Sequence, residues 1–191
     1  MIIKNLKDNK GYTIIETMIA ISLFLIAVTI GMGALLNANL IHNQSQNTRS
    51  IMDNLSFIMD DMSRNLRTGF NYHCVDDGDY NATSAHSCLT DGKGISFQQS
   101  TDGSQWVYGI LSNGSSYEIK KSTDGGNNFI SLNPSEVQID GTKSSFIVTG
   151  AEPGDGLQPF VTIKLVGSIS YKGVAMPFSL QTSVSQRLLD R

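Results

Sequence analysis

The sequence predicts an α+β fold, in which a long N-terminal helix packs through its second half against an antiparallel β-sheet. Three observations carry this prediction. Residues 17–48 contain no Asp, Glu, Lys or Arg, residues 48–66 repeat apolar positions at steps of three and four, and the apolar period changes to two from residue 95. Most glycines and all four prolines follow residue 68. Two differently built parts therefore share the chain.

Composition excludes several classes of function. A length of 191 residues allows one modest domain plus an extended element. The formal charge of −3 argues against a nucleic-acid partner, because such proteins carry a basic face that neutralises phosphates. Two cysteines and three scattered histidines disfavour a four-ligand zinc site. The chain contains no HExxH, GxSxG, GxxxxGK[ST] or CxxC motif, so we expect a protein that is not an enzyme and that holds no cofactor.

The first half of the predicted helix is long and apolar enough to span a membrane. Residues 17–36 are mostly apolar, and about twenty helical residues cross about 30 Å of hydrocarbon. Three lysines and one aspartate precede this stretch, whereas the first base after it is Arg49. By the positive-inside rule, the N-terminus is expected in the cytoplasm and the rest of the chain outside, with the span at about residues 13–36.

Three interpretations of this N-terminal segment compete. A cleaved secretory signal has a shorter apolar core and a small-x-small site after it, which Gly33-Ala34 supplies poorly. A plain signal anchor explains the length and the charge bias. It leaves Glu16 unexplained, because a carboxylate at the start of an apolar run costs a few kcal/mol unless it is paired.

The third interpretation rests on residues 10–16, which read KGYTIIE. A short basic leader ends in Gly11, and an aromatic residue, a small polar residue, two aliphatic residues and Glu16 follow at fixed spacing. This pattern resembles the processing site of type IV prepilins and of the pseudopilins of type II secretion. The resemblance implies a leader of residues 1–11, which a prepilin peptidase removes by cutting between Gly11 and Tyr12. It also implies methylation of the new N-terminus at Tyr12.

This cut would change the charge at the start of the helix. Removing residues 1–11 takes away three lysines and one aspartate, leaves 180 residues and lowers the formal charge to −5. It also creates an α-amine on Tyr12, one helical turn before Glu16. The amine and the Glu16 carboxylate can neutralise each other within one subunit or between neighbours, which would set the axial register of a filament. The alternative is an interfacial Glu16 that extends toward water.

Residues 12–68 are expected to form one helix of about 84 Å from Thr13 onward, with its end marked by Arg67 and Gly69. Gly31 and Gly33 lower the helix propensity within the span. They are candidates either for local melting or for close packing between helices. Acidic and basic residues occupy the face opposite its apolar stripe. The stripe of the second half consists of Thr48, Ile51, Met52, Leu55, Ile58, Met59, Met62 and Leu66.

Residues 95–191 are expected to form an antiparallel meander of seven or eight strands. Two runs of alternating residues, 161–171 and 174–184, predict a long hairpin with a turn at Lys172-Gly173. The shorter predicted strands are 95–99, 106–111, 117–121, 129–132, 137–139 and 146–149.

Residues 69–94 are expected to form a loop region closed by a disulfide. Cys74 and Cys88 are the only cysteines, and the predicted topology places them outside the reducing cytosol. The chain-entropy model gives about 3 kcal/mol for closing a loop of about 15 residues.

The same loop contains a weak candidate for a calcium site. Asp77, Asp79 and Asn81 follow the spacing that opens a calcium loop. The sixth position is Ala82 where such loops have Gly, and the twelfth is Cys88 where they have Glu. A solvated acidic loop is therefore the default interpretation, and no metal is expected.

The function that the resemblance implies is structural. Residues 50–69 and the final strand 180–184 look like the J-type minor pseudopilin of type II secretion or the W-type minor pilins. The implied partners are prepilin peptidase, other pilin or pseudopilin subunits, the secretion or pilus assembly machinery and the cytoplasmic membrane. A major or competence pilin remains open, as does a second class of function: a single-span, membrane-anchored β domain that binds a sugar or a surface without entering a filament.

Overall fold

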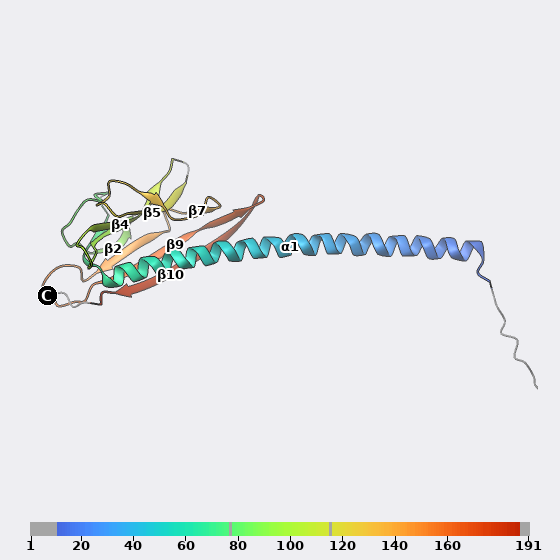
Figure 1. Ribbon diagram of the computed structural model, residues 1–191, viewed down its shortest axis with the longest axis horizontal. Coiled ribbons are helices and arrows are strands. Elements are labelled where there is room, and N and C mark those ends of the chain that lie inside the picture. Colours follow the sequence, from blue (N-terminus) through green and yellow to red (C-terminus); the bar gives the residue numbers. More distant parts are fainter. Residues whose placement is uncertain (1–10, 77, 115, 188–191) are drawn as a thin grey trace, which may run out of the picture. The chain divides into compact units, whose positions relative to one another are not determined.

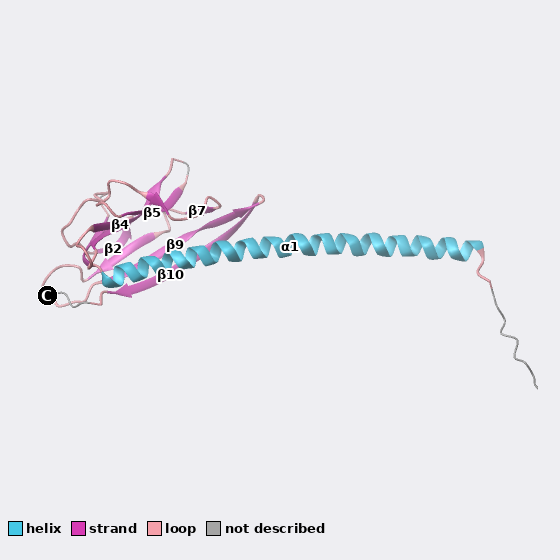
Figure 2. Cartoon of the chain, in the orientation of Figure 1, coloured by secondary structure: helices cyan, strands magenta, loops and turns pink. Residues whose placement is uncertain are grey.

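The computed structural model describes residues 11–76, 78–114 and 116–187 (Figure 1). The chain divides into two compact units, residues 1–46 and 47–191. In its described part the first unit consists of residues 11–13, which are not helical, and the start of helix α1, which begins at Ile14. The second unit contains the rest of that helix and all of the described strands (Figure 2). This confirms the predicted α+β class.

Helix α1 (Ile14–Thr68) is a single α-helix of 55 residues. The predicted start at residue 13 differs by one position, and the predicted end is correct. Gly31, Gly33 and the polar stretch 37–50 all lie within the helix without a break in its assignment. The helix closes where the N–H of Gly69 donates to the carbonyl of Asn65 at 3.0 Å. A Cβ at Gly69 would collide with the ring of Phe97, so a larger residue here would force this buried ring to move.

One antiparallel sheet of ten strands accounts for the described part of the chain after the helix. Its strands are β1 (Phe70–Val75), β2 (Cys88–Gly92), β3 (Gly94–Gln98), β4 (Gln105–Ser112), β5 (Tyr117–Ser122), β6 (Ile130–Ser131), β7 (Val137–Ile139), β8 (Ser145–Thr149), β9 (Phe160–Tyr171) and β10 (Val174–Ser185). The eight strands from residue 94 onward correspond to the eight predicted strands. The turn at Lys172-Gly173 lies at its predicted place, and both residues have positive φ.

The order of the strands differs from a simple meander. The sheet runs β1-β3-β4-β5-β7-β9-β8-β2, with β6 paired to β5 and β10 paired to β9. Strand β9 pairs with β10 over its whole length, while β8 and then β7 share its other edge. Strand β9 is therefore the central strand of this part of the sheet, and β10 is an edge strand.

The region 69–94, expected to be a loop, contains two strands. Strand β1 pairs with β3 and β2 pairs with β8, so they form the two ends of the sheet order. These ends contact each other. The N–H of Cys74 donates to the carbonyl of His86 at 2.9 Å, and the His73 and His86 rings lie 5.4 Å apart, centroid to centroid. Two histidines that are distant in sequence are thus neighbours.

The predicted disulfide between Cys74 and Cys88 is present, with the two Cα atoms 5.8 Å apart. It joins β1 to β2 and so closes the two ends of the sheet on each other. Both cysteines are buried. A Cβ at Gly92 would meet the sulfur of Cys88 and the carbonyl of Phe146 within 3 Å, so the disulfide packs tightly against β2 and β8.

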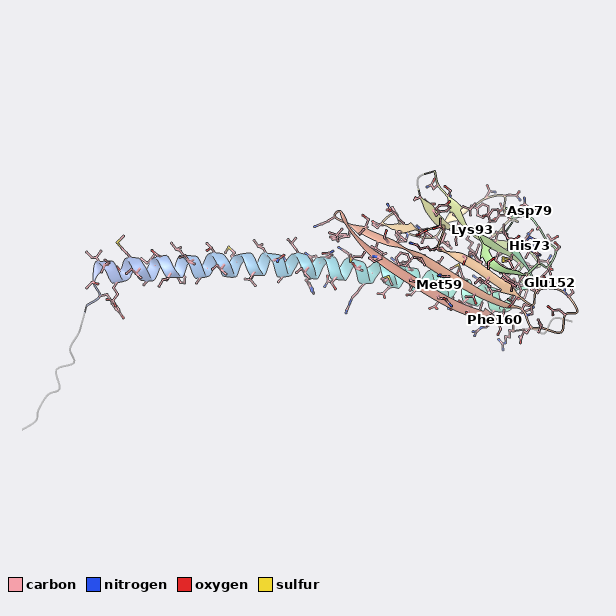
Figure 3. The ribbon with its side chains drawn as sticks, turned by 180° about the vertical axis from the view of Figure 1, so that it is seen from behind. Met59, His73, Asp79, Lys93, Glu152 and Phe160 are labelled. Atoms are coloured by element: carbon pink, nitrogen blue, oxygen red, sulfur yellow. A yellow bond between two sulfur atoms is a disulfide. The ribbon has the colours of Figure 1, made fainter. Side chains whose placement is uncertain are left out.

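The core lies between the second half of α1 and the sheet. Ile51 and Met52 of the predicted stripe are partly buried at its margin, and Met59, seen in Figure 3, is 6% exposed. The buried helix residues are Leu55, Ile58, Met59, Met62 and Leu66. They pack with inward residues of the sheet such as Phe97, Phe146, Ile163 and Leu165. The apolar stripe predicted from the sequence is therefore the surface that covers the sheet.

Candidate processing and assembly site

The Gly11–Tyr12 peptide bond precedes the helix and is open to an enzyme. Neither residue is helical, and both are exposed, with 81% of Tyr12 accessible. A Cβ built on Gly11 meets no atom within 4 Å. Nothing in the described chain therefore covers the bond that the resemblance designates as the cutting site.

Thr13 caps the start of α1. Its hydroxyl accepts a hydrogen bond from the backbone N–H of Glu16 at 3.3 Å, and its carbonyl accepts the N–H of Thr17 at 3.2 Å. A threonine followed three residues later by glutamate is the spacing of a capping box. Sequence reasoning missed this role of Thr13, although the Thr-x-x-Glu pattern could have indicated it.

The capping geometry places Glu16 in the first helical turn. A carboxylate there interacts favourably with the unpaired N–H groups and the positive end of the helix dipole. In the described residues, the Glu16 side chain is exposed and makes no ion pair. Pairing of this carboxylate with the Tyr12 amine stays a prediction for the processed chain.

The apolar stretch after Glu16 has no cover within the chain. Every large apolar side chain of the span is exposed, for example Leu23 at 62% and Phe24 at 66%. Its hydroxyls bond back to helix carbonyls, as Ser22 does to Met18 at 2.8 Å, so they leave no unpaired donor. In the part of the chain that the structure describes, α1 is the one helix long and apolar enough to cross a membrane. Such a surface requires lipid or other helices around it.

These features coincide with a known sequence motif. Residues 6–32 match the prokaryotic N-terminal methylation motif. The motif is the type IV pilin-like prepilin signal, and its match covers Gly11, Tyr12, Glu16 and most of the span. No curated protein and no solved structure shows significant similarity to the chain. The chain therefore carries a type IV pilin-like prepilin signal within residues 6–32, and the position of the cut stays a prediction.

The acidic loop between β1 and β2 is organised by local hydrogen bonds. Asp77, the first calcium candidate, lies outside the described residues. The Asp79 carboxylate accepts the backbone N–H of Asn81 at 3.0 Å, which is a turn interaction. Among the described residues, no group of three His, Cys, Asp or Glu side chains is arranged to hold a metal ion. The calcium candidate stays a prediction from the sequence.

Proposed function

We propose that this protein is a pilin-like structural subunit, a minor pilin or a pseudopilin. Prepilin peptidase cuts it between Gly11 and Tyr12 and methylates the amine of Tyr12. The processed subunit is then assembled into a type IV pilus or a type II secretion pseudopilus. The observation that carries this proposal is the N-terminal methylation motif on an exposed, non-helical peptide bond, directly before an uncovered apolar helix.

The charge distribution supports the orientation. The bases at the N-terminus and the absence of charge from residue 17 to residue 48 favour a cytoplasmic N-terminus, on the side where the peptidase cuts. The β domain would then lie outside, in a compartment where the Cys74–Cys88 disulfide persists. Residues 1–11 serve as the leader, residues 12–68 as the helix of the mature subunit, and residues 69–191 as the exposed domain.

Assembly would depend on the apolar span and on the two charges at its start. In a filament, neighbouring spans cover each other's apolar side chains in place of lipid. The α-amine of Tyr12 then pairs with a Glu16 carboxylate, because both charges are costly in an apolar core unless they neutralise each other. Wrong axial positions leave these charges unpaired, so the pair selects one register.

The test is the intact mass of the membrane-extracted chain, expressed with and without a prepilin peptidase. We expect a peptidase-dependent species that begins at Tyr12, is shorter by eleven residues and carries one methyl group on its amine. Gly11→Ala should be cut nearly as well as the natural chain, because a Cβ at this position meets nothing within 4 Å. Gly11→Trp is the matched variant in which a bulky side chain blocks access and prevents the cut.

A chain that begins at Met1 under both conditions would contradict the proposal. It would favour the alternative of a membrane-anchored β domain that binds a sugar or a surface. The search would then move to ligands of the exposed turns.

A further inference from the structure

Two histidines lie together where the ends of the sheet meet, and the processing motif does not involve them. His73 belongs to β1, and His86 lies two residues before β2. A parallel bridge pairs their backbones, and their ring centroids are 5.4 Å apart. The disulfide between Cys74 and Cys88 joins the same two segments. The backbone and the disulfide therefore hold the two rings side by side.

The His73 ring is buried, and one of its nitrogens has no protein partner. Its side chain is part of a residue that is 6% exposed, and its Nδ1 lies 2.6 Å from the carbonyl oxygen of Ser84. Because a carbonyl only accepts, Nδ1 is the donor, and in the neutral imidazole Nε2 holds the free lone pair. Nε2 is enclosed and makes no hydrogen bond within the described residues. A buried polar atom in this state indicates a ligand from outside the fold.

The His86 ring is half-exposed and is bordered by negative charge. Its Nε2 lies 3.4 Å from the Asp76 carboxylate, so Nε2 can donate while Nδ1 keeps the lone pair. The Glu152 carboxylate accepts the N–H and the hydroxyl of Ser87 at 2.8 and 2.5 Å. These hydrogen bonds lower the pKa of Glu152, and the nearby His86 contributes to the shift. Figure 3 shows His73 and Glu152 at the same end of the domain.

Both rings have the partners that metal-bound histidines have. Such histidines almost always donate their second ring N–H to a carbonyl or a carboxylate, which fixes the tautomer. His73 donates to a carbonyl, and His86 is placed to donate to a carboxylate. Two imidazoles bound at 2.0–2.1 Å to one tetrahedral ion have ring centroids about 5 Å apart. The observed separation of 5.4 Å is therefore close to the value that one shared ion requires.

We propose that Nε2 of His73 and Nδ1 of His86 bind one divalent transition-metal ion of the kind that imidazole prefers, such as zinc, copper or nickel. The half-exposed His86 ring turns toward the fixed His73 ring, and Asp76 and Glu152 offset the charge of the ion. Among the described residues no third protein donor is arranged for the ion, so water completes its coordination. The ion joins β1 to the segment that leads into β2.

This site differs from the calcium candidate in the same region of the chain. Calcium takes oxygen ligands, whereas the two histidines offer nitrogen lone pairs. Both cysteines are bonded to each other, so no free thiol competes for a transition metal. All four residues of the site belong to the second unit, residues 47–191. The inference therefore goes beyond the proposed function and depends neither on processing nor on assembly.

Isothermal titration of the full-length chain with zinc chloride tests the site. The protein is purified in detergent without a histidine tag, and any bound metal is first removed with EDTA. His86→Gln is the main variant, because the His86 side chain is 45% exposed and its loss leaves the core intact. The matched control is His42→Gln, which removes an exposed histidine of α1 that contacts Gln46.

We expect one zinc ion per chain and the same affinity in His42→Gln. His86→Gln should weaken binding at least about tenfold, because one of two protein ligands is lost. Asp76→Asn should weaken it by about tenfold, because this carboxylate orients the ligand. With copper as the probe, the electron paramagnetic resonance spectrum should show splitting from two nitrogens, and from one nitrogen in His86→Gln.

Three results would each overturn the proposal. They are the absence of binding up to about 1 mM zinc, equal affinity in His86→Gln and the natural chain, and a copper spectrum without two nitrogens. The intact mass of the same protein separates these results from the proposed function. A methylated chain that begins at Tyr12 and binds no zinc refutes only the metal site. A chain that begins at Met1 and binds zinc through His86 refutes only the processing.

Discussion

Replacing Tyr72 with phenylalanine would remove one buried hydroxyl from the junction between α1 and β1. Tyr72 is 1% exposed, and its hydroxyl reaches back to the carbonyls of Leu66 and Gly69, the latter at 2.8 Å. Carbonyls in the last turn of a helix have no partner within the helix. The hydroxyl therefore satisfies the end of α1 from the first strand of the sheet.

The expected loss of stability is about 2 kcal/mol. A hydroxyl carries one donor proton, so one net hydrogen bond disappears, with a contribution of about 1 kcal/mol. A buried carbonyl left without a donor adds to the loss, which brings the total to about 1–3 kcal/mol. The ring itself remains, including its contact with Phe97 at 6.3 Å between centroids. For a chain of this size, a loss of about 2 kcal/mol lowers the Tm by about 4–8 °C.

Urea unfolding of the full-length chain in detergent measures this loss. Trp106 is the single tryptophan and lies in β4, so its fluorescence reports on the sheet. The matched control is Tyr117→Phe, because the Tyr117 side chain is 38% exposed and its hydroxyl makes no hydrogen bond within the described residues. If Tyr72→Phe unfolds at the same urea concentration as Tyr117→Phe, the hydroxyl does not cap the helix and the reasoning is refuted.

Alkaline pH provides a second measurement on the same group. Burial raises the pKa of Tyr72 well above its ordinary value of 10.0, and burial does the same to the pKa of Tyr108. At a pH between 10.0 and the raised pKa, each tyrosine keeps its proton in the folded state and has lost it in the unfolded state. Stability is therefore complete below pH 10 and falls above it, by about 1.4 kcal/mol per pH unit for each tyrosine. Tyr72→Phe should remove its share of this slope.

Three further changes have defined outcomes. Replacing both Cys74 and Cys88 with serine should lower the free energy of unfolding by about 3 kcal/mol, because the disulfide closes a loop between residues 14 positions apart. Urea unfolding measures this loss, and an unchanged midpoint would refute the argument from loop closure. The Glu16→Ala variant should be processed normally, yet its ratio of filament to membrane protein should fall roughly tenfold, which corresponds to about 1.4 kcal/mol. Comparing sheared filaments with membranes measures this ratio, and an unchanged ratio counts against the role of Glu16 in setting the register. Hydrogen bonds from Thr142 lower the pKa of Asp140 to about 2. The stability that this carboxylate contributes is therefore complete above pH 3.8 and is lost as the pH falls toward 2. Asp140→Asn should weaken this acid dependence when unfolding is measured at several pH values.

The helix and the long hairpin could be predicted from the sequence because each is governed by local rules. Apolar residues at steps of three and four fixed the buried face of α1, and Gly69 marked its end. The alternation on either side of Lys172-Gly173 predicted the hairpin that β9 and β10 form. The N-terminal methylation motif was recognisable for a similar reason, since the residues that carry the resemblance occupy consecutive positions from Gly11 to Glu16.

Features that depend on distant partners were missed. Four consecutive residues of β1, 72–75, are buried, so the strand lacks the alternation that identifies a half-buried strand. Strand β2 is short and its pairing with β8 is irregular, which hides it further. The insertion of β9 between β7 and β8 is a matter of topology that no local pattern encodes. A pocket of about 410 Å³ between Phe57 and Leu132 was invisible in the sequence, because its two walls are more than seventy residues apart.

The uncovered span also constrains how a subunit can leave the bilayer. Fully covering one large apolar side chain contributes about 1.5–3 kcal/mol, so an isolated subunit in water would lie tens of kcal/mol above its membrane-bound state. Under the proposed function, such a species cannot be an intermediate of assembly. The proposal therefore requires the helix to pass directly from lipid to the growing filament, with its apolar surface covered throughout the transfer. An assembly machine acting in this way would have to supply only the free-energy difference between two covered states, which is far smaller than the cost of exposing the span to water.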